Sequence, residues 1–152
     1  MSLVDAAMRT AHLLFAAVWV GSVLFVTVAI LPLARDGDVN ADPIERITGR
    51  LTTVSRASAL LLFLTGGHMA ANGYTGESLL STTNGNLVLA MLVLWAALAA
   101  LVEIGSSKLT NGLQLKKVRT PAREALPLFR AATAVGVFLL LVAGAITTNA
   151  LV

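Results

Sequence analysis

The stretch that decides the fold is Leu87–Val102, LVLAMLVLWAALAALV, which runs for sixteen residues without a polar side chain. A helix of about 20 residues crosses the ~30 Å hydrocarbon layer of a bilayer. The apolar run therefore predicts a membrane-spanning helix over about 86–105. Irregular backbone is excluded from such a run, because unpaired N–H and C=O groups cannot face lipid.

Three further apolar segments flank this one. Residues 11–34 are interrupted mainly by His12, Ser22, Thr27 and Pro32, and residues 131–146 only by one threonine and two glycines. Residues 57–71 form a weaker segment. The sequence thus predicts four spanning helices, and Pro32 with the following Arg35–Asp38 turn is expected to end the first of them. The expected ranges are about 6–32, 50–72, 86–105 and 127–150.

Composition agrees with a membrane protein. The chain has 152 residues, of which 57% are hydrophobic and 12% charged, and its mean hydropathy is +0.83. Soluble domains carry about 25% charged residues, and one of ~150 residues still exposes about 30% of its unfolded surface. A soluble enzyme, a nucleic-acid-binding protein and a disordered chain are therefore excluded. Cysteine is absent, so disulfides and thiolate metal sites are excluded too.

The distribution of basic residues predicts the orientation. Ten of the 11 Lys and Arg residues lie in or beside the connections 36–48 and 105–126, and only Arg9 lies on the other side. Basic loops stay in the cytoplasm. We expect one domain over 1–152: an all-α, up-down-up-down four-helix transmembrane bundle in the cell membrane, with both termini outside. Its expected partners are the lipid bilayer and further copies of itself.

Two histidines, His12 and His68, are the only ones in the chain, and both fall inside expected spans. Because the first two helices run antiparallel, the two imidazoles are expected in the outer leaflet, offset by under ~6 Å. Ionisable residues inside a membrane are costly and are usually functional. Imidazole binds iron and copper, and helix bundles often hold metal or haem. The first hypothesis is therefore a b-type haem with His12 and His68 as ligands.

Neighbouring residues suit such a haem. Phe15, Ala16 and Trp19 continue the face of His12, and Gly67, with Gly66, would let a flat group approach the backbone. Arg9 lies one turn outward from His12, where a propionate would emerge. Ligation by two histidines leaves no open position, which favours electron transfer with a redox partner protein or a quinone over oxygen chemistry. We therefore expect an electron carrier more than an enzyme, and if the chain is an enzyme we expect a haem-dependent oxidoreductase.

Two other hypotheses stay open. The thioethers of Met8, Met69 and Met91 are expected in the same outer half, and soft ligands suit Cu(I). A copper-binding or copper-transport site would combine the two histidines with Met8 or Met91. Alternatively, the chain is a structural bundle without a cofactor, in which each histidine hydrogen-bonds a neighbouring helix. Helices packed 8–10 Å apart are too close to enclose a porphyrin, so the haem hypothesis requires the histidines to splay or only one of them to ligate.

The stretch Arg9–Gly21, RTAHLLFAAVWVG, resembles the opening helix of the CopD-like membrane proteins. In those proteins a histidine is followed by a "WVG" element and an apolar run. The stretch is also similar to the opening of the HemJ-like protoporphyrinogen oxidases, which are small helical haem-binding membrane proteins. The resemblance implies a haem- or copper-linked membrane protein with His12 as a ligand, and it extends more loosely to the region of His68.

Overall fold

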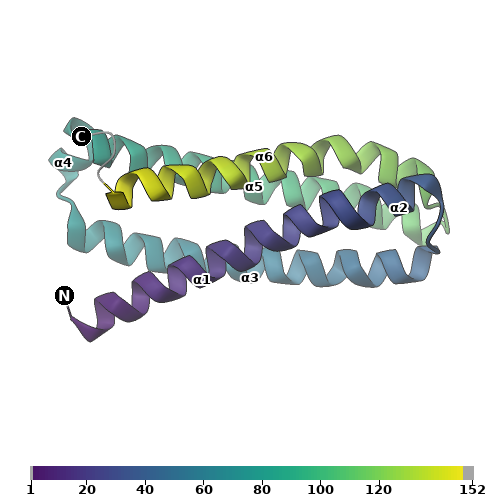
Figure 1. The fold of residues 1–152 in the computed structure, drawn as a ribbon, viewed down its shortest axis with the longest axis horizontal. Helices are drawn as coiled ribbons and strands as arrows, with labels where there is room; N and C mark the ends of the chain where they lie inside the picture. The colour runs from purple at the N-terminus through teal and green to yellow at the C-terminus, as the bar shows by residue number, and fades with distance from the viewer. Residues whose placement is uncertain (1, 149–152) are drawn as a thin grey trace.

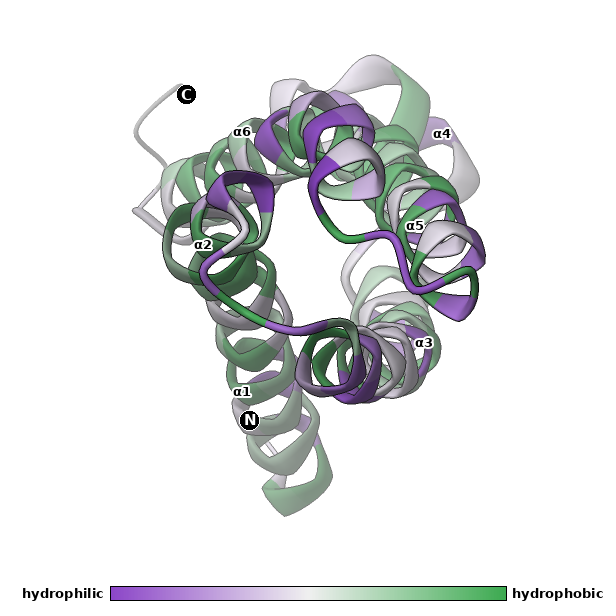
Figure 2. Cartoon of the chain, turned by 90° about the vertical axis from the view of Figure 1, so that its right-hand side faces the viewer, coloured by the Kyte–Doolittle hydropathy of each residue, from purple (hydrophilic) through white to green (hydrophobic). Residues whose placement is uncertain are grey.

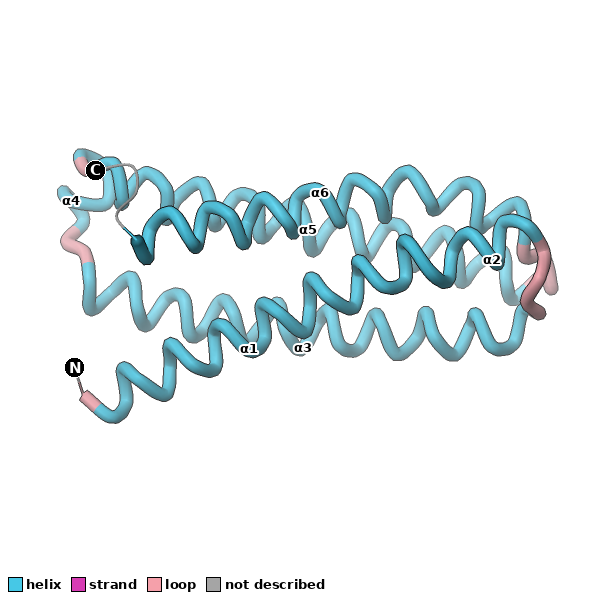
Figure 3. The backbone as a smooth tube through the Cα atoms, in the orientation of Figure 1, coloured by secondary structure: helices cyan, strands magenta, loops and turns pink. Residues whose placement is uncertain are grey.

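The computed structural model describes residues 2–148, and over this range the chain is helical and has no strand (Figures 1 and 3). The expected all-α class is confirmed. The elements in chain order are α1 (Leu3–Phe25), a π-helical turn η1 (Val26–Ile30), α2 (Leu31–Asp36), α3 (Ala41–Gly73), α4 (Gly76–Ser81), α5 (Thr83–Gln114) and α6 (Arg119–Thr148).

Four long helical segments lie side by side, and the chain reverses direction between them (Figure 1). The segment α1–η1–α2 packs on α3 and α6, α3 packs on α5, and α5 packs on α6. The four segments therefore close into a ring, which is visible along the bundle axis (Figure 2). The start of α1 and the end of α6 lie at the same end as α4. The loops 37–40 and 115–118 lie at the other end, which we call the basic end.

Three of the segments are long and apolar enough to cross a membrane: Leu3–Asp36, Thr83–Gln114 and Arg119–Thr148. Three of the four expected spans are thus confirmed as helices of sufficient length and apolar composition. The helix α3 is equally long, with 33 residues, but it is not among the three spans by composition, because its first half is polar. Its crossing of the membrane stays a prediction.

The expected helix bounds are too short at the basic end. The helix α3 begins at Ala41 rather than near 50, α5 continues to Gln114 rather than 105, and α6 begins at Arg119 rather than 127, so that Pro127 lies inside it. These extensions bury only one face, through residues such as Ile44 and Leu109. A mean over an apolar window misses a helix that is polar on its other side. The expected end at 150 lies outside the described residues.

The other two connections also differ from expectation. The 73–85 segment contains the short helix α4, which begins with a capping box between Thr75 and Ser78. Pro32 does not end the first helix. It lies in the first turn of α2, directly after η1, where the N–H of Leu31 bonds to the carbonyl of Val26, five residues back. The wider turn accommodates a proline ring that would clash with an ordinary α-helical carbonyl. The expected stop at the Arg35–Asp38 turn is confirmed, since α2 ends there at Asp36 and is capped by Gly37, with φ 83°.

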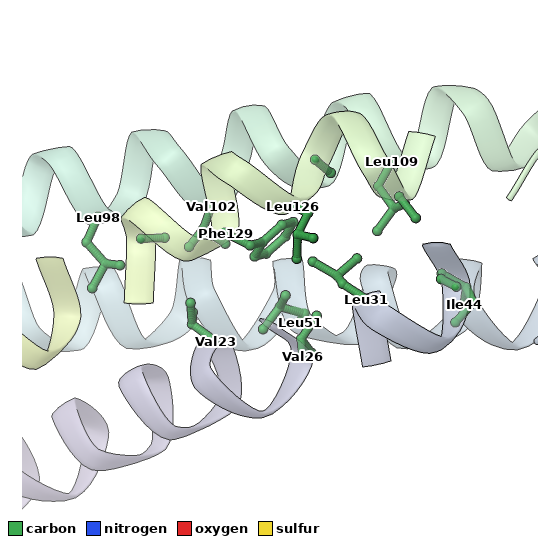
Figure 4. Packing of buried hydrophobic residues seen from close by; sticks show 14 of the residues in the cluster. Val23, Val26, Leu31, Ile44, Leu51, Leu98, Val102, Leu109, Leu126 and Phe129 are labelled. Carbon is green, nitrogen blue, oxygen red and sulfur yellow. The ribbon is translucent and has the colours of Figure 1, made fainter. Parts of the chain in front are cut away.

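Buried hydrophobic side chains from all four segments meet in one cluster (Figure 4). Phe129 of α6 is fully buried, and its ring lies against Gly105 of α5, where a Cβ atom would be only 2.9 Å from Cε2. At the end opposite the basic end, α1 has no buried residue before Trp19. The half of the bundle that contains both histidines is thus loosely packed, and side chains there stay accessible.

Candidate functional site: the α1–α3 interface

Three polar contacts join α1 to α3 along one line. Trp19 Nε1 donates to Ser55 Oγ at 2.7 Å, His12 Nδ1 lies 2.8 Å from Thr65 Oγ1, and Asp5 Oδ1 lies 3.6 Å from His68 Nε2. The three α1 residues are seven positions apart, which keeps them on one face of a helix. Both histidines therefore face the same interface at the loosely packed end, as their matched depth predicts.

The hydrogen bonds of Thr65 determine which ring nitrogen of His12 carries the proton. The hydroxyl of Thr65 also lies 2.7 Å from the carbonyl of Leu61, four residues back on α3, and it donates its single proton there. We therefore assign the second bond to donation from His12 Nδ1–H to Thr65 Oγ1. Nε2 of His12 then keeps a free lone pair. Metal-binding histidines are typically arranged in this way, with one nitrogen donating and the other ligating.

Gly66, which has no side chain, leaves room for the His12 ring. A Cβ atom built on Gly66 would lie 3.1 Å from His12 Cε1, closer than van der Waals contact. The imidazole thus lies directly against the α3 backbone, in the space that a porphyrin was expected to use. The structure therefore offers no support for haem at this point of the interface. Gly67 is exposed and has no atom within 4 Å of its Cβ position.

His68 lies one turn further out on α3 than Thr65. Asn72 holds it from the next turn: Nδ2 donates to the main-chain oxygen of His68 at 3.0 Å and lies 3.2 Å from ring Nε2. On the α1 side the ring faces Asp5. His68 is thus held by residues that differ from those around His12.

The remaining expected site residues have different surroundings. Trp19 is 1% exposed and packs in the core, and Phe15 and Ala16 pack against that core from α1. Arg9 is exposed and makes no ion pair with any residue in the range 2–148.

The two methionines expected as copper ligands, Met8 on α1 and Met91 on α5, are half-buried. Trp95 Nε1 donates to the carbonyl of Ala59 at 3.1 Å. This bond sets the register of α5 against α3, and in that register Met91 lies about level with residue 63 of α3.

Asp5, Thr65 and Ser55 contact the expected site residues, and the sequence alone does not predict these contacts. The seven-residue spacing of Asp5, His12 and Trp19 was the signal that could have found the first of them. The partners on α3 carry no such signal, since a threonine or serine in an apolar helix most often bonds only its own backbone. In residues 2–148 no group of three or more His, Cys, Asp or Glu side chains is placed to hold a metal ion.

In a comparison with protein families, the model for copper resistance protein D, CopD, matches residues 45–148. The chain belongs to the CopD family. The CopD match includes His68 and Met91, whereas the stretch Arg9–Gly21, which carries the resemblance noted in the sequence, lies outside it. The CopD-like resemblance is thus confirmed on other residues, and similarity to the HemJ-like proteins is not shown. Comparison with curated proteins and with solved structures gives no match.

Proposed function

We propose that the chain is a four-span membrane protein that handles copper, with His12 as the central ligand in the outer half of the bilayer. The main support for this proposal is the hydrogen bond of 2.8 Å between His12 and Thr65. This bond orients the imidazole ring and leaves Nε2 free to bind a metal ion. The CopD match supports copper over haem as the bound group. In this proposal copper is the cargo of the protein.

The interhelical contacts support a placement in the membrane. Thr27 Oγ1 lies 3.3 Å from the carbonyl of Phe129, and Phe129 lies against Gly105, so the three residues share one level. We place the inner hydrocarbon boundary there, because Glu103 and Arg130 flank that level and further basic residues follow toward the loops.

Distances along α1 are consistent with this boundary. At 1.5 Å per residue, His12 lies about 22 Å above Thr27, inside a hydrocarbon layer of ~30 Å. Asp5 lies about 33 Å above Thr27, at the outer boundary, where a charged side chain reaches water. The basic end then extends into the cytoplasm and both termini lie outside. The tight core at the basic end fits this placement, since water drives apolar packing there and lipid does not.

The available donors suit copper in its reduced state. Cu(I) prefers soft and imidazole ligands and accepts low coordination numbers. His12 Nε2 on the α1–α3 interface, with the thioether of Met8 on the same helix and that of Met91 on α5 in the outer half, would supply such donors. The lack of a group of three His, Cys, Asp or Glu residues in 2–148 therefore does not conflict with a site for Cu(I).

The other expected partners remain proposals. Exposed apolar side chains fit a lipid environment, and they include Leu13, Leu14, Phe138 and Leu141. Self-association and exchange with a redox partner or quinone are further predictions that the same protein preparation can test.

The test uses the full chain, purified in lipid nanodiscs. Cu(I) binding is measured by competition with a chromophoric chelator, and an absorbance spectrum is recorded before and after dithionite. We expect Cu(I) binding without a Soret band, and an affinity at least ~10-fold weaker in His12→Ala. The matched control is Thr10→Ala, an exposed neighbour whose hydroxyl bonds only to the Ala6 carbonyl. A Soret band that disappears in His12→Ala would replace copper with haem, and equal affinities in both variants would remove His12 from the site.

A further inference from the structure

The carboxylate of Asp5 is held in a fixed position at the start of α1. Its Oδ2 accepts a hydrogen bond from the main-chain N–H of Ser2 at 3.0 Å, while the hydroxyl of Ser2 accepts from the N–H of Asp5 at 3.1 Å. This capping box satisfies the first turn of the helix. It occupies one carboxylate oxygen and leaves the other, Oδ1, facing His68.

The separation of Asp5 Oδ1 from His68 Nε2 is 3.6 Å, which is longer than a hydrogen bond. It matches two ligands of one metal ion. With metal–ligand bonds of about 2.0–2.1 Å, two donors are about 2.8–3.0 Å apart at the 90° angle of a tetragonal Cu(II) site and about 3.5–3.6 Å apart at 120°. An ion between the two atoms would thus require a shift of under ~1 Å, and it would take the place of the contact of 3.2 Å that Asn72 Nδ2 makes with His68 Nε2.

The surroundings favour a divalent ion in contact with water. The side chains of His68 and Asp5 are 33% and 39% exposed, so water can complete the coordination. A carboxylate oxygen, an imidazole nitrogen and water are the ligands of Cu(II) rather than Cu(I), and among divalent first-row ions Cu(II) binds such sites most tightly. Asn72, one turn further along α3, donates to the main-chain oxygen of His68 at 3.0 Å.

We propose that Asp5 Oδ1 and His68 Nε2 form a Cu(II) site at the outer mouth of the α1–α3 interface, separate from the His12 site. Thr65, which holds His12, lies three residues before His68 on α3, so the two sites are about one helical turn apart. The choice of copper rests on the proposed function, whereas the pairing of Asp5 with His68 does not.

The experiment titrates aqueous CuCl2 into the full chain in nanodiscs and follows binding by calorimetry and by electron paramagnetic resonance. In the wild-type protein we expect hyperfine coupling to a single imidazole nitrogen. Asp5→Asn keeps the size of the side chain and should weaken Cu(II) binding by at least ~10-fold. The control is Asp38→Asn, an exposed carboxylate beyond the end of α2, which should leave the affinity unchanged.

Asp5→His separates ligation from simple charge pairing. A second imidazole can ligate but is not an anion, so this variant should retain Cu(II) binding and add a second nitrogen to the resonance spectrum. Circular dichroism checks that each variant keeps its helical content.

Three results would overturn the proposal: equal Cu(II) affinity in Asp5→Asn and wild type, loss of binding in Asp5→His, or loss of the signal in His12→Ala but not in His68→Ala. Failure of the proposed function looks different. In that case the Cu(II) titration still depends on Asp5, while His12→Ala leaves Cu(I) binding unaffected.

Discussion

Replacing Thr65 by valine tests whether the α3 hydroxyl orients the His12 ring. Valine has nearly the shape of threonine but cannot accept the proton of Nδ1. The substitution therefore removes the 2.8 Å interhelical bond while leaving the packing of this buried position almost unchanged. The carbonyl of Leu61 loses only a second, side-chain donor.

The expected loss of stability follows from the N–H group of His12, which has no acceptor once Thr65 is replaced. His12 is half-buried, and a buried donor without a partner costs about 1–3 kcal/mol. Because water reaches part of the ring, we expect Thr65→Val to lower the free energy of unfolding by about 1–2 kcal/mol. Cu(I) affinity should fall by ~10–100-fold, the effect seen when the partner of a ligating histidine is lost.

The assay is unfolding in mixed micelles, followed by tryptophan fluorescence, together with nitrogen NMR of labelled histidine to identify the protonated ring atom. The control is Thr52→Val, which removes a hydroxyl on the same helix that donates only to the carbonyl of Thr48, at 2.9 Å. We expect a change within ~0.5 kcal/mol for this control. If the two valine variants behave alike, or if Nδ1 carries no proton in the wild type, the assigned role of Thr65 is refuted.

Three further predictions concern other parts of the bundle. Ser106→Ala should stabilise the protein by about 1 kcal/mol in the same unfolding assay, because the buried hydroxyl of Ser106 has no hydrogen-bond partner among residues 2–148; destabilisation would mean that it binds a partner such as water. Gly105→Ala should destabilise by about 1–2 kcal/mol, since a methyl group 2.9 Å from Phe129 overpacks the core by more than the gain in helix propensity; an unchanged midpoint would contradict this packing. The Asp42–Lys116 bond at 2.6 Å lowers the pKa of Asp42 below 3.8 and raises that of Lys116 above 10.5. The small stabilisation by this ion pair should therefore be present at neutral pH and disappear as pH falls below 3.8 or rises above 10.5. In Asp42→Asn the loss of stability at acid pH that comes from this pair should be absent.

The candidate site was partly readable from the sequence. His12 and His68 are the only histidines, and their positions in antiparallel apolar segments give their depth by counting residues. The sequence did not indicate that Thr65 bonds to His12 or that Asp5 faces His68. Those contacts depend on the rotation of α1 against α3, and rotation is set by packing along the whole interface rather than by any local pattern.

The haem hypothesis shows the same limit. The glycine pair before His68 predicts space for a flat cofactor, whereas in the structure the imidazole of His12 lies against Gly66. A glycine in a helix indicates a close approach, but it does not indicate which group approaches.

The sequence by itself determined that this protein is helical and lies in a membrane, because a long run of apolar side chains has a favourable environment only in lipid and a backbone in lipid must satisfy its own hydrogen bonds. Only the tertiary structure decided how far each helix extends beyond that run and which nitrogen of His12 is free. Both depend on contacts between residues distant along the chain, such as His12 with Thr65 and Gly105 with Phe129, and the energies of such contacts exist only once the helices have packed.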